Sequence, residues 1–275
     1  MRQKNIIISL LLALFLVAGC SSNTPSETPS NVLRVGMECD YAPFNWSTTE
    51  AGEFTKPIND VDYADGYDVV IASLIAEDLG MDVQIVKLDW DNLILSLQND
   101  QIDLIIAGMT DTEERRQEVS FTTPYYVSEE VIIVKKDSDL SSITSISELS
   151  GRNVIGQLNT IYDDIIDQIE GVNHLPGSDG FGAAIQALKS GAADAVTSEL
   201  PVAIGVCSAN PELTYVRFEN GLGFTDENGD ATVSIAVRKE NTELLNSVQA
   251  SLDRISEEDR QAYMTAATER QPAGE

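Results

Sequence analysis

The sequence contains a single histidine, His174, and only three cysteines, Cys20, Cys39 and Cys207. Metal sites built from several histidines, and catalytic pairs that need a histidine base, therefore have almost no side chains to use. Basic residues are also scarce, since 17 Lys and Arg stand against 45 Asp and Glu and give a formal charge of −28. Nucleic-acid binding depends on clustered Lys and Arg, so we expect no nucleic-acid partner. We also expect no metal and no other cofactor.

Only one apolar run approaches the length that matters for membranes. It spans residues 6–18 (IIISLLLALFLVA), follows Arg2 and Lys4, and is shorter than the ~20 residues of a membrane-spanning helix. It therefore predicts an export signal over residues 1–19. The signal ends in VAGC, which resembles a bacterial lipobox and implies that Cys20 is lipidated and becomes the mature N-terminus. An ordinary cleavable signal with an incidental cysteine is the alternative.

The segment after the signal has no apolar side chain beyond its first residue. Residues 20–31 (CSSNTPSETPSN) are rich in Ser, Thr, Pro and Asn and cannot bury a core, so they predict a lipid-anchored flexible linker. The folded part then runs from about Val32 to about Thr268, which is enough for one large domain or two lobes.

From Val32 onward, short apolar runs alternate with amphipathic stretches. The first half predicts strands at 33–38, 82–88 and 102–108, and helices at 66–80 and 91–100. The second half predicts strands at 153–157 and 194–198, and helices near 161–170 and at 181–190. Such alternation predicts an α/β fold with mostly parallel sheets and flanking helices. Because the pattern appears twice, we expect two lobes.

Two extended stretches lack helical partners beside them. We interpret residues 129–137 and 231–239 as the paired connections where the chain crosses between lobes, a two-strand hinge. Two C-terminal helices, roughly 242–256 and 257–268, would then return to the first lobe. The predicted parts are lobe 1 over 32–126, lobe 2 over 127–231 and the return to lobe 1 over 232–275.

Cys39 and Cys207 would lie in different lobes of this arrangement. A disulfide between them would lock the lobes together, so we expect two free thiols.

Polar residues stand at the ends of several predicted strands. The clearest case is AGMTDTEERRQEVSFTTPYY (107–126), where an apolar strand runs directly into threonines, acids and two arginines. Strand C-termini in α/β sheets are where ligands bind, because the loops there open into a crevice. Three further stretches of this kind are GMECDYAPFNW (36–46), GQLNT (156–160) and SELPVA (198–203).

These stretches resemble the family of extracytoplasmic solute-binding proteins that deliver polar amino acids to ABC importers. The most specific piece is residues 107–126, and GYDV (66–69) and SLQNDQIDLIIAGM (96–109) are similar to the family too. Two departures are Val70, where the family usually has a second acid, and the longer segment 46–65. The resemblance implies a periplasmic-binding-protein-like fold, a free amino acid as ligand and no catalytic residue. It also implies ABC permease subunits as partners, a monomer, and an extracytoplasmic location at the bacterial cell membrane.

A zwitterionic amino acid presents a carboxylate and an ammonium, and burying either group without a partner is costly. Arg115 offers a planar fork for bidentate carboxylate binding. The other candidate donors to the carboxylate are Thr112 and Thr160. The candidate acceptors for the ammonium are Glu199, the Gly108 carbonyl and the Thr110 hydroxyl. The family usually has Asp where Glu199 stands.

The resemblance also implies residues that contact the ligand side chain. Tyr41 and Trp90 would form aromatic walls, Phe44 would lie near the rim, and Glu38 matches an acidic position that contacts polar or cationic side chains. An acid beside two aromatic faces suits Lys, Arg or ornithine through charge pairing and cation–π contact. A glutamine-type ligand stays possible, because the same acid can accept from an amide.

Each candidate residue also has a structural interpretation. Arg115 could be a surface residue, as we expect for its neighbour Arg116. The aromatic residues could be core side chains, Glu38 could cap its loop, and Glu199 could cap the helix that follows it.

Three function classes remain open. The first is a membrane-tethered binding protein that captures an amino acid by hinge closure and hands it to an importer. The second is an enzyme similar to cyclohexadienyl dehydratases, with Glu199 or Glu38 as general acid. The third is an amino-acid sensor lipoprotein without a transporter.

Overall fold

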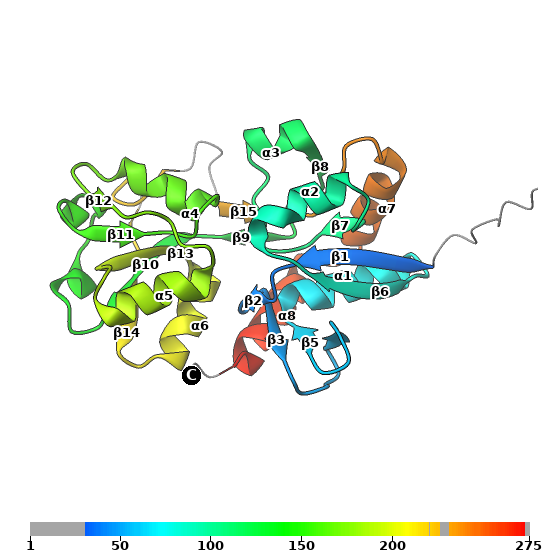
Figure 1. The fold of residues 1–275 in the computed structure, drawn as a ribbon, viewed down its shortest axis with the longest axis horizontal. Coiled ribbons are helices and arrows are strands. Elements are labelled where there is room, and N and C mark those ends of the chain that lie inside the picture. Colours follow the sequence, from blue (N-terminus) through cyan, green and yellow to red (C-terminus); the bar gives the residue numbers. More distant parts are fainter. Residues whose placement is uncertain (1–30, 220, 226–230, 273–275) are drawn as a thin grey trace, which may run out of the picture. The chain divides into compact units, whose positions relative to one another are not determined.

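The structure, a computed structural model, describes residues 31–219, 221–225 and 231–272. The predicted signal peptide, the predicted lipidation site Cys20 and the predicted linker up to residue 30 lie outside these residues. Within them, strands and helices form two lobes, each built on a five-stranded sheet (Figure 1). No helix in this part of the chain is both long and apolar enough to cross a membrane. The predicted α/β class is confirmed.

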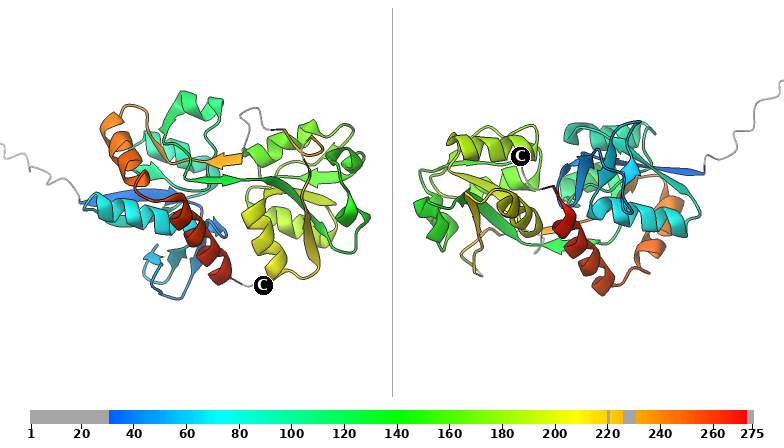
Figure 2. Two further views of the ribbon diagram at one scale, coloured as in Figure 1. Left: turned by 180° about the vertical axis from the view of Figure 1, so that it is seen from behind. Right: turned by 90° about the horizontal axis from the view of Figure 1, so that it is seen from below.

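The sheet of lobe 1 collects strands from distant parts of the sequence. In order, its strands are β6 (Asp82–Lys87), β1 (Val32–Met37), β7 (Leu104–Ile105), β16 (Ala236–Arg238) and β8 (Val119–Phe121). β1 pairs in parallel with β6 and β7, whereas β16 pairs antiparallel with β7 and β8. The helices of this lobe are α1 (Tyr67–Asp78), α2 (Leu93–Gln98), α3 (Glu113–Glu118), α7 (Thr242–Leu252) and α8 (Glu257–Arg270). The last of these, α8, contacts both α1 and α6 (Leu200–Ala209), a helix of lobe 2 (Figure 2).

The sheet of lobe 2 repeats this mixture of pairings. In order, its strands are β12 (Asn173–His174), β11 (Asn153–Ile155), β13 (Ala195–Glu199), β10 (Glu130–Lys135) and β14 (Leu213–Val216). β11 pairs in parallel with β12 and β13, whereas β10 pairs antiparallel with β13 and β14. The helices are α4 (Ile161–Asp164), α5 (Phe181–Ser190) and α6 (Leu200–Ala209), with short 3₁₀ turns η2 (Asp139–Ser142), η3 (Ile146–Leu149) and η4 (Ile165–Gln168). Pairing is therefore mixed in both lobes, where the sequence suggested mostly parallel sheets.

The chain crosses between the lobes next to a short antiparallel pair, β9 (Tyr126–Ser128) with β15 (Ala231–Val233). This pair is shorter than the two predicted stretches. Most of 129–137 is β10, which lies inside the sheet of lobe 2, and the end of 231–239 is β16 in lobe 1. The reason is burial: four consecutive residues of β10, Val131–Val134, are fully buried, which suits a central strand rather than a connection.

The helices predicted at 66–80 and 181–190 agree closely with the structure. α1 and α5 lie within or match these ranges, and the C-cap of α5 is Gly191, whose φ of 82° is the left-handed conformation that glycine favours. Two other predicted helices are more broken than expected. The helix expected near 161–170 is α4 followed by η4, and the one expected at 91–100 is the 3₁₀ turn η1 (Trp90–Asn92) followed by α2.

The longer segment 46–65 forms most of a small antiparallel sheet of its own. Its strands, in order, are β2 (Asp40–Tyr41), β3 (Asn45–Thr48), β5 (Tyr63–Asp65) and β4 (Lys56–Pro57). Arg270, at the end of α8, binds Asp65 with an N–O distance of 2.9 Å and lies over the ring of Phe54 at 4.4 Å. The last helix therefore holds the small sheet in place.

Helix α1 begins where the backbone makes an unusually close approach to the loop before β3. Gly66 has φ 133°, and a Cβ added there would lie 2.2 Å from the Phe44 carbonyl oxygen. The next two amides donate to the same loop, Tyr67 to the Pro43 carbonyl and Asp68 to the Phe44 carbonyl. Only glycine allows this contact, and the contact positions both Tyr41 and the start of α1.

We expect Gly66→Ala to destabilise the protein more than Gly80→Ala does. Gly80 also has a positive φ, 66°, but no atom lies within 4 Å of an added Cβ. Backbone strain alone should cost about 1–2 kcal/mol at Gly80. The added clash should raise the cost at Gly66 to about 3 kcal/mol or more. Urea unfolding followed by circular dichroism measures both, and equal losses in the two variants would contradict the close-approach explanation.

Candidate binding site

Residues from four strand ends meet in one cavity between the lobes. From lobe 1 they come from the segments after β1, β6 and β7, and from lobe 2 they come from the loop after β11 and the start of α4. The residues that line the cavity are Glu38, Tyr41, Trp90, Ala107, Gly108, Thr110, Arg115, Gln157, Thr160, Ile161 and Tyr162. Seven of the nine predicted ligand-binding residues are among them. The other two, Thr112 and Glu199, contact residues of this set.

Arg115 is held in place by its own helix and by two carbonyl groups. The Thr112 side chain caps α3 and accepts from the Arg115 backbone N–H, which fixes the start of the helix. The guanidinium donates to the Thr110 carbonyl at 2.8 Å and to the Asn159 carbonyl at 3.0 Å, and it lies 5.1 Å from the centre of the Trp90 ring. It is therefore not a freely solvated surface arginine.

The electrostatic surroundings of Arg115 disfavour its charge. Burial lowers the pKa of its guanidinium to about 10, and the negative charges of Asp164 and Glu114 offset only part of that effect. In the described part of the chain, no carboxylate forms a salt bridge with it. A partly buried cation whose hydrogen bonds go to carbonyl groups is suited to an incoming carboxylate.

Glu199 is fully buried at the end of β13, immediately before α6. Tyr41, from the other lobe, donates its hydroxyl to Glu199 Oε1 at 2.6 Å. The second oxygen, Oε2, has no partner of good hydrogen-bond geometry among the described residues, although the hydroxyls of Ser128 and Tyr162 face it closely enough to lower its pKa. Burial is the larger effect and raises the pKa of Glu199 to about 7. Its side chain makes no helix-capping bond, so the capping interpretation is wrong.

Glu38 is half-buried and also contacts the opposite lobe. Its Oε1 accepts from Gln157 Nε2 at 2.9 Å. Burial raises the pKa of Glu38 to about 7, the Gln157 bond lowers it, and the nearby acids Asp40, Asp89 and Asp91 raise it. A positive charge placed beside Glu38 would relieve both the burial and the repulsion. Gln157 was not among the predicted site residues.

The remaining predicted groups are buried in the cavity wall. Thr110 and Thr160 are 8% and 7% exposed. Both the N–H and the hydroxyl of Thr160 donate to the Gln157 carbonyl, at 3.3 and 2.7 Å, so a ligand carboxylate would have to compete for these donors. Gly108 has φ 61°, and an added Cβ would lie 3.2 Å from the Tyr41 ring, so the two residues are in close contact.

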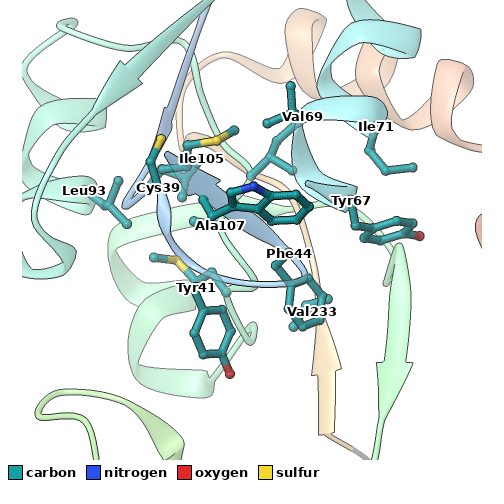
Figure 3. Packing of buried hydrophobic residues seen from close by; sticks show 14 of the residues in the cluster. Cys39, Tyr41, Phe44, Tyr67, Val69, Ile71, Leu93, Ile105, Ala107 and Val233 are labelled. Carbon is teal, nitrogen blue, oxygen red and sulfur yellow. The ribbon is translucent and has the colours of Figure 1, made fainter. Parts of the chain in front are cut away.

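Tyr41 and Phe44 show how the cavity wall merges with the core. Their rings stack with centroids 5.6 Å apart, and the Tyr41 ring also meets the edge of Phe181 from lobe 2 at 5.4 Å. Figure 3 shows Tyr41 at the border of the packed cluster, with its hydroxyl pointing away from the other labelled side chains. Phe44 is fully buried and lies behind Tyr41, not near a rim as predicted, because its ring packs against Tyr67 and Tyr126.

A buried hydrogen-bond network beneath the cavity was missed in the sequence. Asp68 is fully buried and accepts from the Tyr125 hydroxyl at 2.6 Å and from Asn45 Nδ2 at 2.8 Å. Tyr125 in turn accepts from the Gly108 N–H at 3.0 Å, and Asn45 accepts from the Cys39 N–H at 2.7 Å. The network thus joins α1 to the loops that carry Gly108 and Tyr41. An acid in the first turn of an apolar helix was the available signal, but such acids usually face solvent.

Two further predictions are confirmed. Arg116 is an exposed residue paired with Asp111, as expected for a surface arginine. Cys39 and Cys207 are both free thiols. In the described residues, no group of three His, Cys, Asp or Glu side chains is arranged to hold a metal ion.

The space at the centre of the site is small. It is about 20 Å³, which is room for about one water molecule. A larger cavity of about 380 Å³ adjoins it and shares Trp90, Arg115 and Ile161 with it. Asp91, Glu114 and Asp164 also line this larger cavity, so its walls are acidic.

Comparison with known proteins gives consistent results. The sequence profile of the bacterial extracellular solute-binding proteins, family 3, matches residues 33–266. A probable histidine-binding protein of Campylobacter jejuni is 30% identical over 234 residues, 81% of this chain and 85% of that protein. The arginine-binding extracellular protein ArtP of Bacillus subtilis is 30% identical over 210 residues, 76% of each chain. A solved amino acid ABC transporter substrate-binding protein from Streptococcus pneumoniae, bound to L-arginine, has a TM-score of 0.76 at 27% identity and covers 87% of this chain and 94% of its own.

We expect the melting temperature to fall as the pH rises from 5 to 8. Burial raises the pKa of Glu38 and Glu199 to about 7 and that of Asp68 to about 6, above the ordinary values of 4.5 and 3.8. The folded chain therefore binds these protons more tightly than the unfolded chain does. The resulting stability is complete below the ordinary values and is lost as the pH rises through 6 to 7.

Differential scanning calorimetry at several pH values tests this expectation. Asp68→Asn should flatten the dependence, because an amide does not titrate. Asp60→Asn is the matched control, since Asp60 is an exposed acid. A melting temperature that stays constant or rises over this range, or equal slopes in the two variants, would contradict the proposed burial of these carboxyls.

Proposed function

Because the chain belongs to the bacterial extracellular solute-binding proteins, family 3, we propose that it captures a free amino acid between its lobes and delivers it to an ABC importer. The observation that carries this proposal is Arg115. Its guanidinium lines a cavity between the lobes, is held by two carbonyl groups and has no salt bridge among the described residues. An amino acid would bring the missing carboxylate.

The ligand carboxylate binds Arg115, because a guanidinium can hold both carboxylate oxygens in one plane. Thr112 stabilises the helix that presents Arg115, and its hydroxyl, which accepts from the Arg115 N–H, would add a donor to the carboxylate. Thr160 adds donors once its contacts with the Gln157 carbonyl are exchanged for contacts with the ligand. These three residues come from both lobes, so the carboxylate interacts fully only when the lobes are together.

The ligand ammonium binds on the opposite side of the cavity. Glu199 supplies a buried carboxylate, and the Gly108 carbonyl and Thr110 hydroxyl supply neutral acceptors. An ammonium beside Glu199 would lower the pKa of this carboxyl from about 7, because an opposite charge favours the ionised form. To accept from the ammonium, Glu199 would either lose the hydrogen bond from the Tyr41 hydroxyl or accept from both groups at once.

The ligand side chain lies between Tyr41 and Trp90 and points toward Glu38. This arrangement favours a cationic side chain such as that of arginine, lysine or ornithine. Glu38 is half-buried among other acids, so a positive charge beside it would be favourable. Tyr41 and Trp90 also line the cavity, and their rings would add cation–π contact. Two of the relatives named above are described as arginine-binding or arginine-bound, which supports the same class. Glutamine is the neutral alternative, since its amide can donate to Glu38.

Capture requires the lobes to move. The central space of about 20 Å³ is far too small for an amino acid, so the bonds that join the lobes must open to admit one and form again around it. β9 and β15 are the natural hinge, because they lie at the point where the chain crosses between the lobes. A ligand that contacts both lobes stabilises the closed arrangement by those additional contacts.

The protein acts outside the cytoplasm, as its family does. We further propose that a lipid on Cys20 holds it at the cell membrane, that it works as a monomer, and that permease subunits receive the ligand. A dehydratase is the second candidate, because carboxyls with pKa values of about 7, Glu38 and Glu199, suit a general acid. Turnover of prephenate or arogenate by the purified protein would favour the dehydratase.

Titration calorimetry of the mature domain against the twenty amino acids, ornithine and cystine tests the proposal. We expect sub-micromolar binding of one or two ligands with a cationic side chain. Glu38→Gln should weaken binding of these ligands by about tenfold or more, because it removes a half-buried charge partner. The same variant should leave glutamine binding within about threefold, because an amide partner survives.

Asp60→Asn, on the exposed part of the small sheet, is the control for a change of one negative charge. Absence of binding to every free amino acid would contradict the proposed function. Strong binding of glutamine alone, with Glu38→Gln unchanged, would keep the function and overturn the cationic class.

A further inference from the structure

We propose that Asn159 is a closure latch, a residue of lobe 2 that holds lobe 1 in place and sets how long a captured amino acid stays bound. The inference rests on the proposed function and adds a residue that lies in the strand-end stretch GQLNT but not in the predicted ligand-binding set. Asn159 is exposed and stands in the loop between β11 and α4, directly before Thr160.

Three side chains of lobe 1 converge on this one residue. The Asn159 carbonyl accepts from the Trp90 indole N–H at 3.0 Å and from Arg115 Nη2 at 3.0 Å. The Asn159 side-chain amide donates to Asp91 Oδ1 at 2.8 Å. Glu199 and Gln157, two other residues of lobe 2, each form one hydrogen bond to lobe 1, with Tyr41 and with Glu38. Asn159 therefore forms more hydrogen bonds to lobe 1 than either of them.

The backbone of Asn159 is held in an uncommon conformation. Its φ is 59°, in the left-handed region that residues other than glycine rarely adopt. Asparagine is among the residues that tolerate this region best, and unlike glycine it adds an amide donor. A glycine would satisfy the backbone requirement alone, so the asparagine supplies something that the backbone does not need: the bond to Asp91.

The latch is coupled to the ligand through Arg115. The guanidinium of Arg115 donates to the Asn159 carbonyl and is also the group that would bind the ligand carboxylate. A carboxylate that fixes Arg115 therefore also fixes the donor that Asn159 accepts from. These bonds can form only when the lobes are together, so they slow the opening that releases ligand and have little effect on the encounter with it.

Stopped-flow kinetics with the tightest-binding amino acid from the calorimetry tests the latch. Asn159→Gly keeps the left-handed backbone and the carbonyl but removes the amide. We expect its dissociation rate to rise by about five- to tenfold, the effect of one ordinary hydrogen bond at a solvent-exposed position, while its association rate stays within twofold. Asp91→Ala should match it, and Asp91→Asn should recover most of the loss because its amide oxygen still accepts.

The double variant Asn159→Gly/Asp91→Ala should dissociate no faster than either single variant, since both remove the same bond. Leu158→Ala is the matched control, because Leu158 is the exposed neighbour and its side chain has no hydrogen bond to lobe 1. Dissociation rates within twofold of the wild type in both single variants, or fully additive effects in the double variant, would overturn the latch.

A second measurement tests the latch without depending on which ligand the protein binds. Spin labels, one on each lobe, report the distance between lobes without any ligand. Asn159→Gly should shift this distribution toward larger separations, and Leu158→Ala should not. If wild-type protein binds no amino acid but the shift is seen, the proposed function fails and the latch stands. If amino acids bind and no shift is seen, the latch fails alone.

Discussion

The structure depends on a positive charge that is partly buried and forms no salt bridge with any carboxylate of the described residues. Arg115 lines the cavity between the lobes, its pKa is lowered to about 10 by burial, and its bonds go to the carbonyls of Thr110 and Asn159. Such a charge is costly unless something in the site repays it, because carbonyl dipoles replace only part of the lost hydration. A carboxylate is the group that completes it, so this constraint leads from fold to function.

The two acids on the other sides of the cavity carry negative charges that burial also makes unfavourable. Glu38 and Glu199 are both removed from water, and burial raises the pKa of each to about 7. In this structure each accepts a hydrogen bond from the opposite lobe, from Gln157 and from Tyr41. A zwitterion with a cationic side chain supplies a carboxylate for the arginine and two positive charges for the acids. The same ligand therefore satisfies both lobes, and satisfying both lobes is what holds them together.

Local patterns in the sequence predicted the parts of the site that stand at strand ends. The apolar run before Gly108 and the polar turn after it placed two arginines at a strand end, and the resemblance of residues 107–126 to the family singled out Arg115. The α/β class followed from the alternation of strands and helices. Long-range pairings could not be predicted in this way. Asp68, Gln157 and Asn159 lie in stretches that the sequence singled out, GYDV and GQLNT. Nothing in those stretches shows which side chains of distant loops these residues meet, so their roles appear only in the structure. The small sheet was missed because its strands have two to four residues, too few to show a period, and because its anchor Arg270 lies 205 positions from Asp65.

The most direct test of the central claim removes the carboxylate from the ligand and the guanidinium from the protein in turn. Calorimetry would compare the tightest-binding amino acid with its α-carboxamide, on wild-type protein and on Arg115→Ala. We expect wild-type protein to prefer the amino acid by about 100-fold or more, the effect of a bidentate charged pair. We expect Arg115→Ala to bind both compounds equally and weakly. If Arg115→Ala keeps the full preference for the amino acid, another group holds the carboxylate and the account is wrong.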